Sequence, residues 1–464
     1  MSSKYLKYAA CLAVSIPAIG AAQPAPPPGG PPGGMPAMPS MAETKYDAII
    51  DVIDGRLVPS TVAIQATSLS GSAAKGLRIL SSKEGVNALI VRGPASDFTL
   101  TDPAIALSGA GTNDFLGTGA GILVRDKARL TLRGGSVETS ARISPALVAA
   151  EGATVKIHDA RLVANGGPLP PGYVPRIGPG MMEPPAPLGL QGTARTVLAM
   201  SNSRTYLYNT RIEAQGWGAL STDATGGDLY LEANDCTVLV TGKGYGAYAD
   251  FGAHVVLNRT SVDVGSDLGI IAGKARIDLN AVRGKARRSG VMIHSVMAFD
   301  PAETADLFVT DSTIETQGPV LLVKSANANI TVTGGALKSA SGVLMDVRRN
   351  DDPNATKTGG KPVPGVTLTL RSGKLTGDVL DSDPDRATTL VLDGASLEGS
   401  LRGVVLKADA TGHWRARSDS TVSLAPGTPL SVIDAPTGVT VTVTGGTNGR
   451  NTVLPSGGKL TFSR

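Results

Sequence analysis

The 464-residue chain has few cysteines and few aromatic residues. Aromatic residues make up 4% of the sequence, and the two cysteines are Cys11 and Cys236. Cys11 lies in an N-terminal segment that we expect to be removed on export, so Cys236 would remain alone and no internal disulfide could form. The apolar segment that contains Cys11, Tyr8–Gly20, is too short to span a membrane.

The sequence also lacks the short motifs of common cofactor and catalytic sites. It has no zinc-ligand spacing, P-loop, dinucleotide fingerprint or nucleophile elbow, so we expect no metal and no cofactor. Its 43 Lys and Arg against 39 Asp and Glu give a net charge of +4. A nearly neutral chain of this length has no nucleic-acid signature, so we expect no nucleic-acid partner.

What the chain does contain is a repeat, which is clearest within Gly121–Gly167. The copies GILVRDKARLTLRGGSVETS and ALVAAEGATVKIHDARLVAN align at a spacing of 25 residues, so that Leu130 matches Val155 and Val137 matches Leu162. Each copy alternates short strands with Gly, Asn or Asp turns, which argues against helix. A fixed period of about 20–50 residues is typical of a solenoid.

The same apolar position recurs to the end of the chain, mostly in steps of 22 to 26 residues where no loop intervenes. Such steps suit a coil of three short strands, and successive coils would stack as parallel strands about 4.8 Å apart. One coil cannot bury its apolar face alone, so stacking supplies the core. The predicted anchors are Ile105, Val137, Leu162, Ile212, Val238, Val262, Val282, Ile314, Leu337, Leu375, Leu397 and Val422.

Units such as GATVKIHDARLVANGG and DLFVTDSTIETQG resemble those of right-handed parallel β-helix proteins secreted by bacteria. That group includes adhesins, autotransporter passengers and polysaccharide-degrading enzymes. The resemblance implies an all-β, right-handed parallel β-helix over roughly residues 44–464. It leaves function open, because this fold hosts both binders and enzymes.

The N-terminus predicts export to the periplasm or the cell exterior. Residues 1–22 have the basic start, apolar segment and small-residue end of a signal peptide. Residues 23–43 are rich in Pro and Gly and predict a disordered linker. The β-helix would begin at residue 44, with Tyr46–Leu57 and Thr61–Leu69 as an irregular cap over the first coil.

Four loops interrupt the predicted coils, at residues 109–118, 166–194, 283–304 and 347–365. Insertions in solenoids often gather on the binding face. The second loop contains eight prolines between Pro168 and Pro187. Proline lowers the entropy cost of ordering a loop, so we expect a fixed wall, although a tolerated surface insertion is the alternative.

Near these loops, one column of strand-end positions breaks the small-aliphatic pattern. Aligning Trp217 with Tyr245 and Leu220 with Tyr248 predicts the column. Gly273 would leave a gap between Asp250 and His294, which would lie two coils and about 10 Å apart. The predicted column contains Asp223 (or Thr222), Asp250, Gly273, His294, Lys324 (or Val323) and Asp346.

The residue types in this column are those of general acid–base chemistry. The predicted catalytic residues are Asp223, Asp250, His294, Lys324 and Asp346. The predicted substrate-binding residues are Trp217, Tyr245 and Tyr248, as an aromatic platform, with Tyr173, Arg288 and Arg348. The structural alternatives are turn capping by the aspartates, a satisfied buried histidine, and packing of Trp217 and Tyr245 against the proline-rich loop.

Other polar residues are predicted to be structural. Asparagines recur at 25, 24 and 22 residues and suit tight turns or a ladder of stacked amides. No partners can be assigned to three of the histidines. These residues are Asn209, Asn234, Asn258 and Asn280, and His158, His254 and His413.

Two functions follow. The first is an exported enzyme acting on a glycan or cell-wall polymer. A lyase would use a base, a proton donor and a cation, whereas a hydrolase would pair Asp223 or Asp250 with Asp346. The second is a non-catalytic, adhesin-like surface or periplasmic binding protein. The predicted partner is a glycan, another extracellular polymer or a small aromatic ligand.

Overall fold

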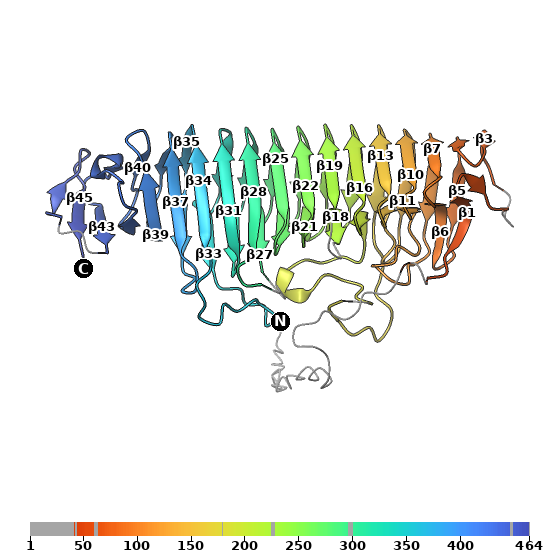
Figure 1. The fold of residues 1–464 in the computed structure, drawn as a ribbon, viewed down its shortest axis with the longest axis horizontal. Coiled ribbons are helices and arrows are strands. Elements are labelled where there is room, and N and C mark those ends of the chain that lie inside the picture. Colours follow the sequence, from red (N-terminus) through yellow and green to blue (C-terminus); the bar gives the residue numbers. More distant parts are fainter. Residues whose placement is uncertain are drawn as a thin grey trace, which may run out of the picture. The chain divides into compact units, whose positions relative to one another are not determined.

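The computed structural model describes residues 41, 44–59, 64–178, 180–223, 228–295, 300–445 and 449–463. The expected signal peptide, and all of the expected linker except residue 41, lie outside these residues. The described residues belong to one compact unit, Met35–Arg464, which is almost entirely β-strand. It forms the parallel β-helix that the repeat predicts, with its strands stacked side by side (Figure 1).

Most coils contribute one strand to each of three parallel ladders, and the last coils lack a strand in the first ladder. The first ladder contains β1 (Asp47–Ile53), β6 (Val86–Arg92), β9 (Ile122–Arg125), β12 (Leu147–Ala149), β15 (Arg195–Met200), β18 (Trp217–Asp223), β21 (Gly244–Asp250), β24 (Gly269–Ala272), β27 (Val291–His294), β30 (Leu321–Lys324), β33 (Val343–Arg348), β36 (Asp378–Asp381) and the start of β39 (Leu401–Ala408).

The second ladder contains β4 (Ala73–Lys75), β7 (Asp97–Thr101), β10 (Arg129–Arg133), β13 (Thr154–His158), β16 (Arg204–Tyr208), β19 (Tyr230–Asn234), β22 (His254–Asn258), β25 (Arg276–Asn280), β28 (Thr304–Thr310), β31 (Asn327–Thr333), β34 (Val366–Arg371), β37 (Thr388–Asp393), the end of β39, β41 (Ser420–Leu424), β43 (Thr440–Thr444) and β45 (Lys459–Phe462).

The third ladder is split in two. Its longer part contains β5 (Arg78–Ser81), β8 (Ala104–Leu107), β11 (Ser136–Thr139), β14 (Arg161–Ala164), β17 (Arg211–Ala214), β20 (Thr237–Val240), β23 (Ser261–Val264), β26 (Arg283–Ala286), β29 (Thr313–Thr316) and β32 (Ala336–Ser339). Its shorter part contains β35 (Lys374–Thr376), β38 (Ser396–Glu398), β40 (His413–Arg415) and β42 (Ile433–Asp434).

The pairing register confirms the aligned copies, because Leu130 lies opposite Val155 and Val137 lies opposite Leu162. Two predicted anchors are wrong. Gly284, not Val282, occupies the third-ladder position opposite Val262, and Val422 belongs to β41 of the second ladder. The glycine is tolerated there because Leu268 fills its space, since a Cβ on Gly284 would meet Leu268 Cδ1 at 2.0 Å.

Most turns after second-ladder strands contain a residue in the left-handed region, which Gly, Asp and Asn reach at low cost, although Arg259 and Ala281 also adopt it. Asn209 is such a residue, with φ +46°, and is not part of the asparagine ladder. The ladder itself is one position earlier. Asn258 donates to Asn234 and Asn280 donates to Asn258, each at 2.9 Å, so that part of the prediction is confirmed.

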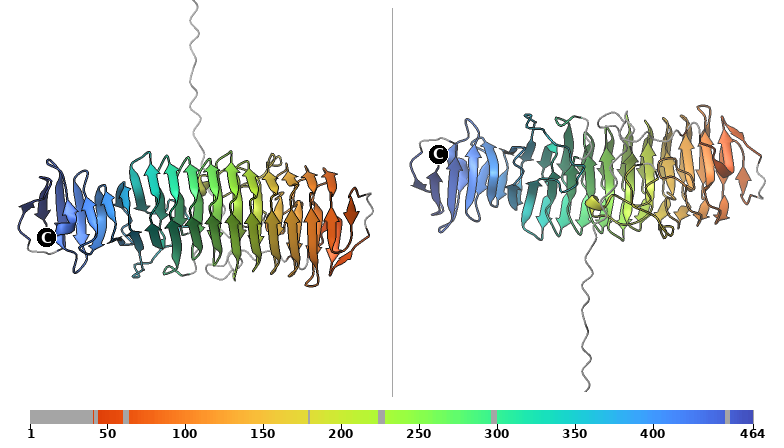
Figure 2. Two further views of the ribbon diagram at one scale, coloured as in Figure 1. Left: turned by 90° about the horizontal axis from the view of Figure 1, so that it is seen from above. Right: turned by 90° about the horizontal axis from the view of Figure 1, so that it is seen from below.

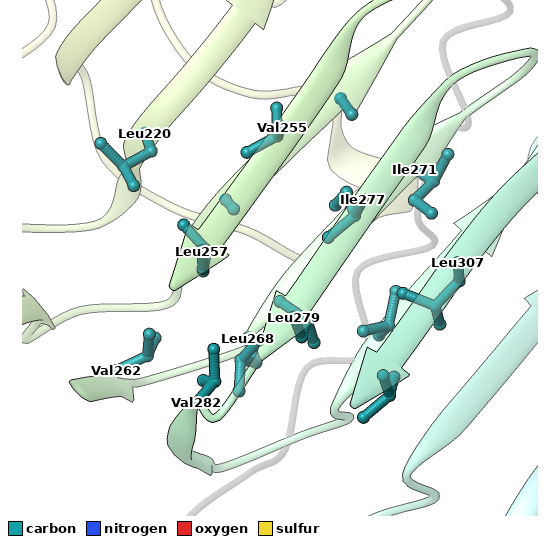
Figure 3. Packing of buried hydrophobic residues seen from close by; sticks show 14 of the residues in the cluster. Leu220, Val255, Leu257, Val262, Leu268, Ile271, Ile277, Leu279, Val282 and Leu307 are labelled. Atoms are coloured by element: carbon teal, nitrogen blue, oxygen red, sulfur yellow. The ribbon is translucent and has the colours of Figure 1, made fainter. Parts of the chain in front are cut away.

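A continuous aliphatic core runs through the coils. Residues from all three ladders point into it, and Figure 3 shows part of it around Val255, Ile277 and Leu307. First-ladder strands such as β27 are buried at every position, so the other face of this ladder is covered as well. Burial on both faces explains why these strands read as continuous apolar runs.

Short antiparallel strands cover the ends of the β-helix. β2 (Arg56–Leu57) pairs with β1, β3 (Ser68–Leu69) pairs with β4, and β44 (Thr452–Val453) pairs with β45. Such pairing protects the end strands from association with other chains. The expected irregular cap at Tyr46–Leu57 is wrong in part, because β1 is a regular first-ladder strand that pairs with β6.

The longest interruptions all flank the first ladder. Residues 108–121 and 165–194 precede β9 and β15, whereas 295–303 and 349–365 follow β27 and β33. The expected loop at 283–304 is wrong at its start, because β26 and β27 lie within its first part, at 283–286 and 291–294. The single-turn helix η1 (Ala186–Leu188) of the second loop lies over the strands in Figure 2, right. A second such helix is η2 (Leu430–Val432).

Candidate functional site

The outer face of the first ladder aligns most of the predicted catalytic side chains. Successive coils place Asp250, Ala272, His294, Lys324 and Arg348 opposite one another. Ser221 lies opposite Tyr248, and Asp223 and Asp250 each follow these residues by two positions. The charge of Asp250 raises the pKa of Asp223, so the two carboxylates interact. We call Asp223, Asp250, His294 and Lys324 the acid–base row.

The register corrects two members of the predicted column. Ala272, not Gly273, separates Asp250 from His294, and Arg348, not Asp346, follows Lys324. Asp346 lies opposite Leu322, in the neighbouring row. It is four coils from Asp250, about 19 Å. The structure therefore does not bring Asp346 within the range of a hydrolase pair, which is at most about 9.5 Å.

Two carboxylates contact one buried guanidinium at one end of the row, and a third, Asp250, interacts with one of them. Arg195 forms ion pairs with Asp114 and with Asp223, the latter at 3.1 Å, and its guanidinium stacks over Trp217. Asp250 accepts a hydrogen bond from the Thr222 hydroxyl at 2.8 Å. The Asp114 side chain is fully buried and that of Asp223 is 17% exposed. One guanidinium cannot neutralise all of these carboxylates.

The excess negative charge changes the proton affinity of Asp223. Burial raises its pKa and Arg195 lowers it, but Asp250 and Asp114 raise it further, and the result is a pKa of about 7. Burial also raises the pKa of Asp114, against the effect of Arg195. With a pKa of about 7, Asp223 is partly protonated near neutral pH.

The expected aromatic platform is not open to solvent. Trp217 and Tyr245 are 3% and 2% exposed, and the Tyr245 hydroxyl bonds to the Ser221 hydroxyl at 2.9 Å. The predicted alignment of these two residues is wrong by one position, because Tyr245 lies opposite Gly218. The Tyr245 ring occupies the space that a Cβ on Gly218 would need. Only Tyr248 remains half-buried.

The proline-rich loop covers this aromatic cluster. Met181 and Leu190 are buried in one apolar cluster with Trp217 and Tyr245. This is the packing alternative that the sequence leaves open for the two aromatic residues. Tyr173 is used inside the loop, where its hydroxyl accepts a hydrogen bond from the Met182 amide at 2.9 Å.

Arg288 holds this loop against the strands. It donates to the Leu188 carbonyl at 2.6 Å, and its Nε donates to Asp267 at 2.9 Å. Asp267 is completely buried and also accepts from the Ser289 amide. Arg288 thus links the proline-rich loop to the strands of the β-helix. Asp267, which holds the Arg288 side chain in place, was not predicted from the sequence.

His294 is a buried neutral imidazole. It is 3% exposed, and its Nε2 is buried without a hydrogen-bond partner among the described residues. Burial lowers its pKa to about 4, with further lowering by Lys324 and Arg288. Lys324 pairs with Asp351, on the loop that follows β33. The predicted alternative, a buried histidine whose ring nitrogens are both hydrogen-bonded, therefore does not hold for Nε2.

Arg348 and Asp346 form a more exposed pair. Their closest atoms are 3.5 Å apart, and the two side chains are 51% and 23% exposed. Their predicted binding and catalytic roles remain predictions. Two cavities, of about 280 and 350 Å³, lie elsewhere, beside Trp414 and beside Asp51.

Within the described ranges, no group of three or more His, Cys, Asp or Glu side chains is arranged to hold a metal ion. No helix among the same residues is long and apolar enough to cross a membrane. Comparison of the sequence with models of known families finds no match, and comparison with curated proteins finds no significant relative.

Sequence reasoning missed Asp114, Arg195 and Asp267. Asp114 lies in the first loop and meets Arg195 across 81 residues, so no local spacing could predict the contact. A useful signal was present at Arg195, because this charged residue begins β15, a buried strand whose other residues are mostly apolar. Such a residue needs a buried partner.

Proposed function

We propose that the protein is an exported enzyme that hydrolyses glycosidic bonds, with Asp223 and Asp250 as its carboxylate pair. One observation supports this most: Asp223 has a pKa of about 7 and lies beside a second carboxylate. Glycoside hydrolysis needs one protonated and one ionised carboxyl group near the scissile bond. Carboxyl groups whose pKa values are separated by their surroundings meet that need.

In this proposal Asp223 is the general acid. It protonates the glycosidic oxygen as the bond to the leaving sugar breaks, and Asp250 attacks the anomeric carbon to form a glycosyl ester. Asp223 then takes a proton from a water molecule, which attacks the same carbon and releases the sugar from Asp250. Neighbouring strands lie about 4.8 Å apart. Carboxyl groups on adjacent strands at this spacing can approach to the roughly 5–5.5 Å that is found in enzymes that retain anomeric configuration. We therefore propose a retaining reaction.

Substrate access sets a further requirement. Asp250 is only 4% exposed, and the loop of residues 165–194 packs on the same face. A polymer reaches the pair only when the covering side chains or the loop move aside. Tyr248, half-buried in the neighbouring row, would be the first ring to meet a sugar. Burial and Asp250 keep its pKa well above 10, so its hydroxyl remains a donor.

The lyase alternative uses the other end of the acid–base row. His294 is neutral and lies next to Lys324, which matches a base beside a cation. Lys324, however, is already paired with Asp351. The catalytic roles of His294 and Lys324 therefore remain predictions, and the carboxylate pair is preferred.

The second candidate is a non-catalytic binding protein. The burial of Asp250 and His294, at 4% and 3% exposure, favours it, because an inert row would be covered in this way. Export itself is proposed from residues 1–22 alone, whose sequence has the pattern of a secretory leader.

The test is turnover on a panel of neutral and acidic polysaccharides, measured as the release of reducing ends. Asp223→Asn and Asp250→Asn should each lose about a hundredfold or more of activity. Asp263→Asn is the matched control, because Asp263 lies on β23 in a surface pair with Arg287. Melting temperatures show whether each variant is folded.

Two results would reject the proposal. One is a wild-type protein that cleaves nothing on the panel, which favours the binding protein. The other is full activity in both carboxylate variants, which places the site elsewhere. If cleavage occurs, the anomeric configuration of the first product, measured by NMR, should match that of the substrate.

A further inference from the structure

A second candidate site lies on the exposed face of the second ladder. Five half-exposed rings gather there on four neighbouring coils: His158, Tyr206, Tyr208, Tyr230 and His254. We call them the aromatic strip. In Figure 1 the second-ladder strands β13, β16, β19 and β22 face the viewer without a loop in front of them.

The rings form two groups of contacting rings, which are joined through the shared strand β16. His158 stacks on Tyr208 with centroids 4.8 Å apart, Tyr206 lies 5.7 Å from Tyr230, and Tyr230 meets His254 edge-on at 5.2 Å. On a chain with 4% aromatic residues this is a marked concentration on one solvent-facing surface. Solvent-exposed aromatic clusters commonly mark binding surfaces.

Hydrogen bonds fix part of the strip in place. The Tyr230 hydroxyl donates to Glu232 at 2.8 Å, and His254 lies 2.8 Å from Asp278, which also binds Arg276. Rings held in this way lose little conformational entropy when a ligand binds. By contrast, no hydrogen bond engages the hydroxyls of Tyr206 and Tyr208 within the described part of the chain, so both can serve a ligand.

The charges around the strip are of both signs. Lys156 and Glu232 lie opposite Tyr206 on its two sides, and several of the other charges are paired. Asp278 is shared by His254 and Arg276, and Arg204 pairs with Asp228. Asn258 donates to Glu232 at 3.2 Å. A strongly charged ligand would therefore gain little here, and the surface suits a neutral one.

The size of the strip selects the kind of ligand. The four strands span three spacings, about 14 Å along the solenoid, and the rings lie within about five residues of strand, about 13 Å. The resulting area of about 190 Å² is well below the roughly 800 Å² per partner of a stable protein interface. A narrow chain laid along the solenoid axis fits this area.

We propose that the aromatic strip binds a neutral, extended glycan chain by ring stacking and by hydrogen bonds from the Tyr206 and Tyr208 hydroxyls. It would hold a polymer on a different ladder from the carboxylate pair. The inference deepens the proposed function, because it assumes the same class of ligand, but it concerns binding and not cleavage.

The experiment is a titration of the protein with hexasaccharides of β-linked glucose, mannose and xylose, with oligogalacturonate as the charged comparison. Wild type should bind at least one neutral hexasaccharide more tightly than the charged one. Tyr206→Ala and Tyr230→Ala, made separately, should each raise Kd about fivefold to tenfold. Tyr206→Phe keeps the ring and should lose less.

Thr331→Ala is the control, because Thr331 is half-exposed in the same outer row as Tyr206, on β31. Asp223→Asn should bind as wild type does, which separates this site from the carboxylate pair. Circular dichroism checks the fold of every variant. Unchanged Kd in a folded Tyr206 or Tyr230 variant would overturn the proposal, as would wild type that binds no neutral hexasaccharide or prefers the charged one.

Discussion

Asp223 and His294 both lie in the acid–base row, and the fold raises the pKa of Asp223 but lowers the pKa of His294. The Asp223 carboxyl has a pKa of about 7, so it keeps its proton up to about pH 7. The His294 imidazole has a pKa of about 4, so it stays neutral down to about pH 4. In both cases burial disfavours the charged form. The two groups therefore contribute to stability in different ways as pH changes, and single variants separate them.

For Asp223 the folded pKa lies above the unfolded value of about 3.9. The folded state thus binds more protons, and the stability from this group is present below about pH 4 and is lost as pH rises through 7. Asp223→Asn removes the titrating carboxyl, so the variant no longer loses this stability as pH rises. The melting temperature of the variant, relative to wild type, should be higher at pH 8 than at pH 5. An equal difference at both values would show that Asp223 titrates normally.

For His294 the folded pKa of about 4 lies below the unfolded value of about 6.5. The stability from this group is present above about pH 6.5 and is lost as pH falls towards 4. His294→Gln should therefore gain melting temperature relative to wild type at pH 5 but not at pH 8. The opposite trend would mean that the imidazole has an anionic partner in solution.

At the scale of the element, the proline-rich loop depends on Arg288 for its position. Arg288→Ala removes the bond to Leu188 and leaves Asp267 buried with fewer partners. Limited proteolysis should then cut within residues 165–194 faster than in wild type, and the melting temperature should fall. Arg283→Ala, an exposed arginine on β26, is the control. Unchanged cleavage would show that apolar packing alone holds the loop.

The coils could be predicted from sequence, whereas parts of their register could not. Leu130 and Val155 align correctly because their strands and turns have equal length. The alignment slips by one residue at Tyr245, where β18 begins with Trp217 at φ +40° and the preceding loop varies in length. A slip of one residue changes the face of every side chain.

The aromatic strip was missed for a related reason. His254 had no visible partner in sequence, yet Asp278 lies 24 residues later and Tyr230 lies 24 residues earlier. Contacts of this kind follow the coil period, so they appear only once the register is fixed. The ion pair between Asp114 and Arg195 differs, because Asp114 lies in a loop that does not follow the coil period.

At the scale of the molecule, the solenoid places two distinct surfaces on two ladders: a loop-covered row on the first and an open strip on the second. The whole chain has a further expected step, export with loss of residues 1–22. N-terminal sequencing of exported protein should begin near Gln23. A product that still starts at Met1 would remove the basis for an extracellular substrate.

The central claim is that Asp223 holds a proton near neutral pH beside Asp250. Difference infrared spectroscopy of wild type against Asp223→Asn measures that proton directly and needs no substrate. We predict a carboxylic-acid band that is present in wild type at pH 5, disappears with a midpoint near pH 7, and is absent from the variant. A wild-type carboxyl that is already ionised at pH 5, near its ordinary pKa of about 3.9, would contradict the account.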